Sequence, residues 1–185
     1  MPDSPAIDDL FIERFRAYLK LLASSQLHSW LRQRVDASDL VQQTMLDAVA
    51  HRDDFHGTTD GEFLGWLKRI LVNNLVDAKR HHGRGKRDVA RDRSLDAEIS
   101  QSFCRVDALA LSQSSPSQKA ATNEQLLRLP DALEQLSSAQ RDVIVLHHLQ
   151  GLTLTDTAER IGRSEAAVGG LLYRGLERLN ELLDH

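Results

Sequence analysis

Apolar residues recur at steps of three and four along most of this chain, and this periodicity constrains its fold more than any other feature. A helix brings residues three and four apart onto one face, so the pattern predicts amphipathic helices that bury their apolar faces together. The 185 residues include only four prolines, and the alternating patterns typical of strands are scarce. We therefore predict an all-α fold.

The first block of helical pattern lies in the N-terminal half of the chain. Apolar residues recur first over 10–22, a second helix should follow Asp36, and a long helix should run over about 62–82. Before the long helix, Phe-His-Gly-Thr-Thr-Asp-Gly at 55–61 is typical of a loop. These elements predict a small helical domain over residues 8–83.

The second block lies in the C-terminal third. Leucines recur there at helical spacing, and capping-box patterns that begin at Ser137 and Thr153 mark two helix starts. The first of these helices should continue through Leu149, and Pro130 is expected near the start of an earlier one. The block predicts a second helical domain over residues 125–185.

Between the two blocks the helical pattern weakens. Residues 100–121 are rich in Ser and Gln around Pro116, and such a composition buries little apolar surface. We predict a flexible linker over 84–124, in which only residues 106–111 have the composition of a short helix.

Positive charge is concentrated in one part of the chain. The net charge is −4, yet residues 66–93 hold nine Lys and Arg against three Asp and Glu. The flanks are acidic, with six basic against eleven acidic residues before this stretch and eight against thirteen after it. This asymmetry predicts a local contact with a polyanion, and the alternative is a solvated basic face.

Three residues near the C-terminus have the spacing of a helix-turn-helix. That motif needs a small residue where two helices cross, a glycine in the turn and an apolar anchor in the second helix. Ala158, Gly162 and Val168 have these properties, and Ser164 would cap the second helix, whereas another kind of tight helical corner explains only part of the pattern. The second helix begins with small residues, so we expect close approach to DNA rather than strong reading of base edges.

The long helix has a second face beside its apolar one. Trp66, Arg69, Asn73 and Arg80 follow one another at steps of three, four and seven, and Lys68 flanks them. An aromatic ring, a planar amide and cations on one stripe suit single-stranded nucleic acid, because bases stack and phosphates need countercharge. The competing interpretation is a core tryptophan beside solvated arginines.

Other classes of protein are disfavoured. A single cysteine, Cys104, excludes a disulfide framework and a cysteine-rich zinc site. Apolar runs such as 143–146 are too short to span a bilayer, and the acidic N-terminus lacks the basic region of a signal peptide. Adjacent His81 and His82 point about 100° apart on a helix, which favours titrating cations over metal ligands. We expect a cytoplasmic protein without a metal, a cofactor or a membrane partner.

Blocks of sequence, taken in order, indicate a family. These blocks are Asp-Ala-Ser-Asp-Leu-Val-Gln-Gln-Thr at 36–44, Phe-Leu-Gly-Trp-Leu-Lys-Arg-Ile-Leu-Val-Asn-Asn-Leu-Val-Asp-Ala-Lys-Arg at 63–80, Leu-Ser-Ser-Ala-Gln-Arg-Asp-Val-Ile at 136–144, and the stretch 151–179. The first block resembles the polymerase-binding helix of the sigma-70 family of transcription initiation factors, and the second resembles the promoter-melting helix of that family. The last two blocks resemble its C-terminal domain. The short chain, with no domain between the halves, resembles the extracytoplasmic-function (ECF) subfamily.

The resemblance implies a role for each matched residue. The partners would be the bacterial RNA polymerase core, through its β and β′ subunits, and promoter DNA, with an anti-sigma factor as an optional third. The residues implied to contact the polymerase are Asp39, Gln42, Gln43 and Thr44. Those implied to engage the −10 element are Phe55, Trp66, Lys68, Arg69, Asn73 and Arg80, with the 56–61 loop near a flipped-out base. Those implied to engage the −35 element are Arg163, Ser164, Glu165, Ala167, Gly169, Gly170, Tyr173 and Arg174.

The implied function is that of a non-enzymatic sigma factor, with a region 2-like domain at 8–83 and a region 4-like domain at 125–185. It would bind core polymerase and direct promoter recognition, DNA melting and transcription initiation. The first alternative is a helix-turn-helix regulator that binds duplex DNA as a dimer, which leaves the 36–80 blocks without a role. An enzyme is the last alternative, because acids such as Asp53 and Asp60 have no partnered histidine or nucleophile nearby in sequence.

Overall fold

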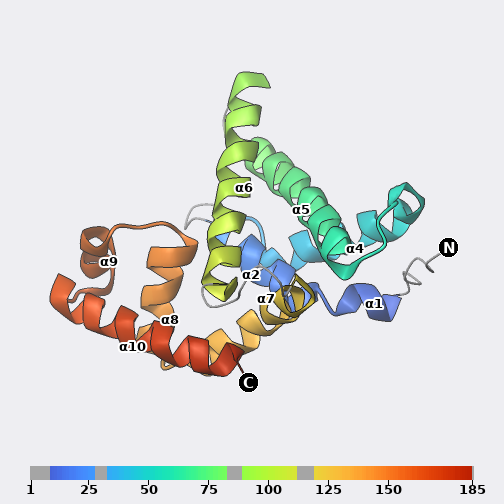
Figure 1. Cartoon of the computed structure of the whole chain (residues 1–185). Helices are drawn as coiled ribbons and strands as arrows, with labels where there is room; N and C mark the ends of the chain where they lie inside the picture. Colours follow the sequence, from blue (N-terminus) through green and yellow to red (C-terminus); the bar gives the residue numbers. More distant parts are fainter. Residues whose placement is uncertain (1–8, 28–32, 83–88, 112–118, 185) are drawn as a thin grey trace. The chain divides into compact units, whose positions relative to one another are not determined.

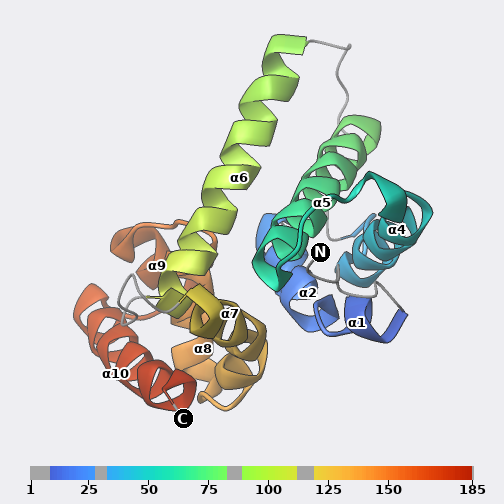
Figure 2. The ribbon, with the colours of Figure 1, turned by 45° about the vertical axis from the view of Figure 1, so that its right-hand side comes forward.

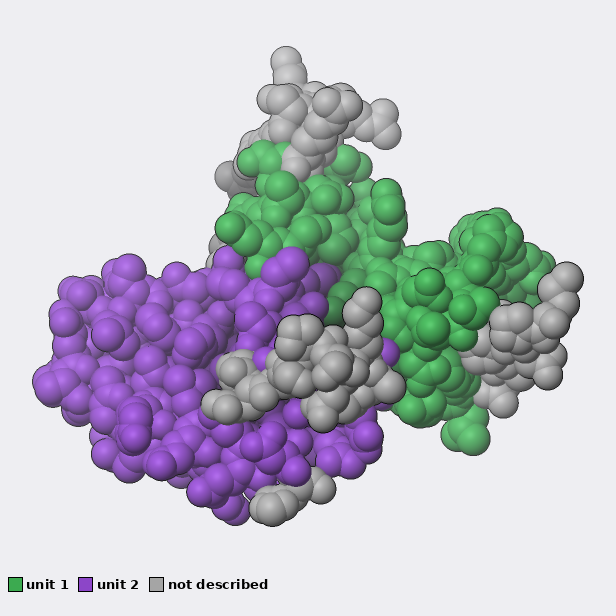
Figure 3. Space-filling view, in the orientation of Figure 1, with its two compact units in different colours: residues 1–101 green, residues 102–185 purple. Residues whose placement is uncertain are grey.

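Helices make up all the regular structure that the computed structural model describes, namely residues 9–27, 33–82, 89–111 and 119–184 (Figure 1). This confirms the all-α class. The chain divides into two compact units, residues 1–101 and residues 102–185 (Figure 3).

Unit 1 is built around one long helix. Helix α5 (Asp60–His82) packs against α4 (Ala37–Ala50), and α2 (Arg16–Gln26) packs against both (Figure 2). A short α1 (Asp9–Glu13) precedes α2, and a 3-10 turn (Arg52–Asp54) follows α4. The largest fully buried side chains of this core are Phe15, Tyr18, Leu19, Leu22, Phe63, Leu64, Leu67, Leu71 and Leu75.

The first helical pattern is interrupted between α1 and α2. The backbone N–H of Phe15 donates to the carbonyl of Ile12, three residues back, and this tighter turn breaks the α-helical ladder. Leu10, which shares the apolar spacing of its neighbours, is 78% exposed. The buried face of the pattern over 10–22 therefore does not include Leu10.

Helix α4 begins where its sequence predicts. The carboxylate of Asp36 accepts a hydrogen bond from the backbone N–H of Ser38 at 2.6 Å, and this bond lowers the pKa of Asp36. An N-cap of this kind satisfies one of the free donors of the first turn. The second predicted helix of the first domain is confirmed.

Unit 2 contains the helix-turn-helix. Its helices are α7 (Lys119–Glu134), α8 (Ser138–Ile144), α9 (Leu154–Ile161) and α10 (Glu165–Leu183). Both predicted capping boxes, at Ser137 and Thr153, are present, and the hydroxyl of Ser164 caps α10. Val143, Ala158 and Val168 form a buried cluster on which the neighbouring apolar side chains pack. The predicted helix-turn-helix is confirmed.

Two helices of unit 2 depart from the prediction. Pro130 lies well inside α7 instead of near a helix start. The helix that begins after Ser137 does not run uniformly through Leu149, because residues Val145–Leu149 form a π-helical turn. There the backbone N–H of Gln150 donates to the carbonyl of Val145, five residues back, at 2.9 Å.

The stretch predicted as a flexible linker contains a helix. Helix α6 spans Val89–Leu111, and the boundary between the two units falls within it. Its buried side chains follow at helical steps and are Ile99, Phe103, Val106, Leu109 and Ala110. In unit 2, the Ser102 hydroxyl also donates to the Leu149 carbonyl at 3.1 Å. The Ser and Gln content concealed an apolar stripe that stabilises the helix, so the prediction of a flexible linker is wrong for the described part of α6. Residues 84–88 and 112–118 of the predicted linker lie outside the described residues.

Candidate functional site

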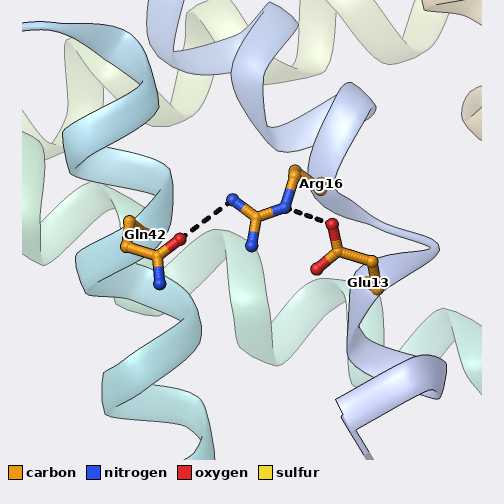
Figure 4. Close-up of polar contacts among 3 residues, drawn as sticks. All are labelled: Glu13, Arg16 and Gln42. Carbon is orange, nitrogen blue, oxygen red and sulfur yellow. Dashed lines mark hydrogen bonds and ion pairs between the residues drawn. The ribbon is translucent and has the colours of Figure 1, made fainter.

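One face of α4 exposes three of the four residues that were predicted to contact the polymerase. Asp39, Gln42 and Gln43 are exposed there. The guanidinium of Arg16 donates through Nη1 to Gln42 Oε1 at 3.1 Å, and its Nε pairs with the carboxylate of Glu13 (Figure 4). The side chain of Gln42 is thereby held against α2 while it remains accessible.

Thr44, the fourth predicted contact, does not belong to this face. Its side chain is fully buried, and its hydroxyl donates to the Leu40 carbonyl at 2.8 Å. Because an α-helix has about 3.6 residues per turn, Thr44 lies on the same side of the helix as Leu40, four residues earlier, and that side is buried. We therefore remove Thr44 from the predicted surface.

A polar chain joins α4 to α5. Gln43 Nε2 donates to Asp47 Oδ1, four positions later on the same helix, at 2.8 Å. Asn74 Nδ2 donates to Asp47 Oδ2 at 2.9 Å and to Thr44 Oγ1 at 3.2 Å. Neither Asp47 nor Asn74 was predicted as a site residue, because their contact depends on how two helices pack.

The predicted polar stripe of α5 is accessible. Arg69, Asn73 and Arg80 are exposed, and Arg80 Nη1 pairs with Asp77 Oδ1 at 3.0 Å. Lys68 is half-buried, with Nζ 5.2 Å from the centre of the Tyr18 ring. The stripe therefore offers cations and one amide to a ligand.

Lys79 lies at the margin of this stripe. Burial lowers the pKa of Lys79, and the nearby carboxylate of Glu98 on α6 opposes that shift. Within unit 1, α6 thus contributes a negative charge beside the basic end of α5.

Trp66 and Phe55 belong to an aromatic cluster at the start of α5. The ring of Phe63 is 5.1 Å from that of Phe55 and 5.6 Å from that of Trp66, and the rings of Phe55 and Trp66 are 5.5 Å apart. Phe63 is fully buried, whereas Phe55 and Trp66 are half-buried. Each of these two rings has one side in the core and another accessible, so the two interpretations of Trp66 are compatible.

The loop before α5 is held by a capping box that the sequence analysis missed. The Glu62 carboxylate accepts hydrogen bonds from the backbone N–H groups of Thr58 and Thr59 and from the Thr59 hydroxyl, and these bonds lower the pKa of Glu62. The Thr59 hydroxyl in turn accepts from the Glu62 N–H at 3.2 Å. The Thr-x-x-Glu pattern at 59–62 was the available signal.

Gly57 allows Phe55 to fold back over this loop. A Cβ atom at Gly57 would lie 2.4 Å from Cζ of the Phe55 ring and 2.9 Å from Cβ of Glu62. A side chain at this position would displace the ring, so the glycine permits the observed position of Phe55.

The turn of the helix-turn-helix has the geometry that its glycine predicts. Gly162 has φ +66, a left-handed conformation that favours glycine, and it ends α9. Across the turn, the Thr155 hydroxyl donates to Glu165 Oε1 at 2.8 Å. The two helices are therefore joined by a polar bond as well as by the buried cluster.

The predicted DNA-facing side of α10 is small in its first turns and polar afterwards. Arg163, Ser164, Glu165, Tyr173 and Arg174 are exposed, with Tyr173 at 70%, whereas Ala167, Gly169 and Gly170 are partly exposed. A Cβ atom at Gly169 would meet nothing within 4 Å, and the atoms nearest to one at Gly170 would be those of the Arg174 guanidinium, at 3.4 Å and beyond. The start of α10 is consequently a low surface with cations at its margins.

Gly175 has a structural role that the sequence analysis missed. It is buried, and a Cβ atom there would lie 3.0 Å from Ile144 Cδ1 and 3.2 Å from Gln140 Cβ. The glycine permits the close approach of α10 to α8. The available signal was its helical spacing, because Gly175 follows the buried Val168 by seven residues and precedes the buried Leu179 by four.

The described ranges contain neither a metal-binding cluster nor a membrane-spanning helix. No group of three His, Cys, Asp or Glu side chains in these ranges has the arrangement of a metal site. Among the same residues, no helix combines the length and apolarity needed to cross a membrane. The rings of His81 and His82 lie 5.0 Å apart at the end of α5.

Two family models match the chain, one in its N-terminal half and one in its C-terminal third. The family model described as Sigma-70 region 2 matches residues 13–85, and the model described as Sigma-70, region 4 matches residues 126–179. The chain is 31% identical to RNA polymerase sigma factor CnrH of Cupriavidus metallidurans, over 80% of this chain and 74% of that protein.

Two further relatives show the same relation. RNA polymerase sigma factor CarQ of Myxococcus xanthus is 31% identical, over 80% of this chain and 74% of its own length. ECF RNA polymerase sigma factor SigD of Mycobacterium tuberculosis is 27% identical, over 81% of this chain and 64% of its own length. The similarity therefore extends through both units.

Proposed function

The chain belongs to the sigma-70 family as an ECF-type RNA polymerase sigma factor, and we propose how its surfaces divide promoter recognition and transcription initiation between them. The observation that carries the proposal is the presence of both family regions in one chain, in order, at 13–85 and 126–179. A duplex-binding regulator would need only the second region, so the first region requires a further partner.

The exposed face of α4 is the proposed contact with the β′ subunit of core polymerase. Its members are Asp39, Gln42 and Gln43, and exposure of all three supports the assignment. Docking to a large partner also suits a small helical unit, since such units bury a modest fraction of their surface when alone.

The stripe of α5 is the proposed contact with the −10 element. Arg69 and Arg80 would offset phosphate charge, Lys68 would add to the local field, and Asn73 would bond to a base edge. The accessible sides of Trp66 and Phe55 would stack on unpaired bases, including one flipped toward residues 56–61. The capping box at Glu62 supports this by ordering the loop before DNA arrives.

The start of α10 is the proposed contact with the −35 element. Arg163, Ser164 and Glu165 open the helix, and Ala167, Gly169 and Gly170 let the DNA backbone approach closely. Tyr173 and Arg174 would contact the adjacent backbone. Because few of these residues form bidentate bonds with bases, α10 would contribute more to affinity than to sequence discrimination.

The remaining features of the proposal follow from the resemblance. The chain would act in the cytoplasm without performing a catalytic step, since the polymerase supplies the chemistry. The domain limits 8–83 and 125–185 and an anti-sigma factor as a further partner stay predictions.

The test is co-elution of the full chain with bacterial core RNA polymerase, in wild-type form and as the Asp39→Arg, Gln43→Arg variant. We expect stable binding by the wild type and its loss in the variant, because two large cations would be forced into the interface. A matched control is Asp131→Arg, Gln135→Arg, which exchanges the same residue types at the same spacing on the exposed side of unit 2.

The control should keep polymerase binding. Failure of the wild type to bind polymerase, combined with dimers that shift duplex DNA, would replace this function with that of an ordinary helix-turn-helix regulator. Equal losses in the variant and the control would show that α4 is not the contact.

A further inference from the structure

The polar chain between α4 and α5 connects an exposed side chain to a half-buried one on another helix. Gln43 is exposed on α4, and its amide donates to one oxygen of Asp47 at 2.8 Å. Asn74, half-buried on α5, donates to the other oxygen of Asp47 at 2.9 Å. Gln43 and Asn74 therefore donate to the two different oxygens of the same carboxylate.

Asp47 is held from more than one direction. Its two oxygens are each used by a different amide, which fixes the plane of the carboxylate. Asn74 is itself positioned by a second bond, from Nδ2 to Thr44 Oγ1 at 3.2 Å, and the Thr44 hydroxyl is anchored to the Leu40 carbonyl. The buried threonine thus fixes Asn74, Asn74 orients Asp47, and Asp47 orients Gln43.

Orientation of an exposed glutamine affects binding. A free glutamine samples many rotamers, so a partner that immobilises it reduces its side-chain entropy. The contacts made on binding must offset that unfavourable entropy change. A side chain already held in one orientation loses less on binding, so preorganisation increases affinity without a new contact. Here the amide of Asn74, on the helix α5 proposed to meet DNA, limits the motion of Gln43 through the carboxylate of Asp47.

We propose that Asp47 and Asn74 are positioning residues for the polymerase contact, through which α5 sets the orientation of Gln43 on α4. The proposal rests on the proposed function of the α4 face. Neither residue has to touch the polymerase. Their effect on polymerase affinity passes through Gln43, which gives the proposal a signature that a purely structural role lacks.

The test is a double-mutant cycle on the dissociation constant of the full chain and core polymerase. Asn74→Ala should weaken binding about two- to tenfold, the range expected for ordering one side chain. In a Gln43→Ala background, Asn74→Ala should change binding by less than about twofold, since the side chain that it orients is gone. Equal effects of Asn74→Ala in both backgrounds would overturn the proposal.

Conservative replacement of the central residue provides the matched control. Asp47→Asn keeps an acceptor for Asn74 and can donate to the Gln43 carbonyl oxygen after that amide flips, so it should restore most of the affinity that Asp47→Leu loses. Thermal unfolding of each variant measures any general loss of stability. If Asp47→Asn and Asp47→Leu weaken binding equally at similar melting temperatures, the positioning role is contradicted.

A second readout does not need polymerase. In the free full-length chain, the Gln43 side-chain amide should give NMR relaxation typical of an ordered group, and Asn74→Ala should make it mobile. Ordering by Asn74 without polymerase binding by the wild type would leave the polar chain intact and reject the proposed function. Polymerase binding with a Gln43 amide that is equally mobile in both proteins would reject the positioning role alone.

Discussion

Helices α5 and α10, the two proposed to meet promoter DNA, expose opposite kinds of surface. Helix α5 presents Arg69, Asn73 and Arg80 beside the accessible side of Trp66. Helix α10 begins with a low surface around Gly169 and Gly170. The difference indicates two modes of binding. Helix α5 can hold unpaired bases by stacking and charge, whereas α10 gains affinity from close approach to a duplex.

The strongest way to break this comparison is to remove the stacking surface of α5. Trp66→Ala should reduce promoter opening by polymerase holoenzyme about 5- to 150-fold, since base stacking on an aromatic side chain contributes about 1–3 kcal/mol. Trp66→Phe retains a ring and should lose much less. Permanganate reactivity of melted thymines measures the effect. Equal defects in the two variants would indicate that Trp66 acts only through its packing on Phe63.

The next test separates the glycines of α10. Gly175→Val should lower the free energy of unfolding of unit 2 by about 1–3 kcal/mol, because the new side chain would overpack against Ile144 and Gln140. Gly169→Ala, made in open space in the same helix, should instead stabilise it by up to about 1 kcal/mol. Urea unfolding followed by NMR of unit 2 measures both. Similar changes in the two variants would contradict the assignment of Gly175 to the core.

A third change would make α10 more like α5. Gly169→Arg introduces a long cation where nothing lies within 4 Å of the new Cβ, and it should strengthen the dependence on a −35 element by about 1 kcal/mol, near the low end for a base contact. Transcription from promoters with intact and scrambled −35 elements measures the change. An increase that is equal on both promoters would indicate added phosphate contact without sequence reading.

The smallest effect concerns the pH dependence of the two units. Burial, together with the neighbouring His147, lowers the pKa of His148 below 6.5. Below pH 6.5 the folded state therefore binds fewer protons at His148 than the unfolded state. The contribution of neutral His148 to the free energy of unfolding is complete above pH 6.5 and is lost as the pH falls through 6.5 toward the folded pKa. In the described part of the structure, His148 Nε2 is buried without a hydrogen-bond partner, so a proton added there has no acceptor.

The corresponding group in unit 1 responds at lower pH. The backbone and hydroxyl bonds to Glu62 lower its pKa below 4.5, so its contribution is present above pH 4.5 and is lost as the pH falls further. Between pH 7 and about 5.5 we expect the melting temperature of unit 2 to fall more than that of unit 1, and His148→Leu to remove much of the difference. Thermal unfolding followed by amide resonances of each unit measures this. Parallel decreases in the two units would contradict it.

Local signals predicted much of the structure. The N-caps at Asp36, Ser137, Thr153 and Ser164 and the turn at Gly162 all depend on residues within a few positions, so the sequence carries the complete interaction. The exposed residues of α5 were predicted for the same reason, since helical spacing alone places them on one face.

Features that depend on packing between helices were missed. Thr44 was assigned to the polymerase contact because the family resemblance implied it, although its side chain is fully buried in the core. The bond between Asn74 and Asp47 joins residues 27 positions apart, and no local pattern indicates it. Helix α6 was missed because overall composition was weighed above the spacing of Ile99, Phe103 and Val106.

The π-helical turn at Val145–Leu149 makes this segment tolerant of a change in length. It contains one residue more than an α-helical turn would need to reach the same carbonyl. Because the wider turn takes up that residue locally, deletion of one residue here would restore α-helical hydrogen bonds and leave the residues on either side with nearly the same phase. The same deletion in the middle of α10, which is regular, would rotate all the residues after it by about 100°. In unit 2, therefore, a shortened chain would be accommodated at Val145–Leu149 more easily than in α10.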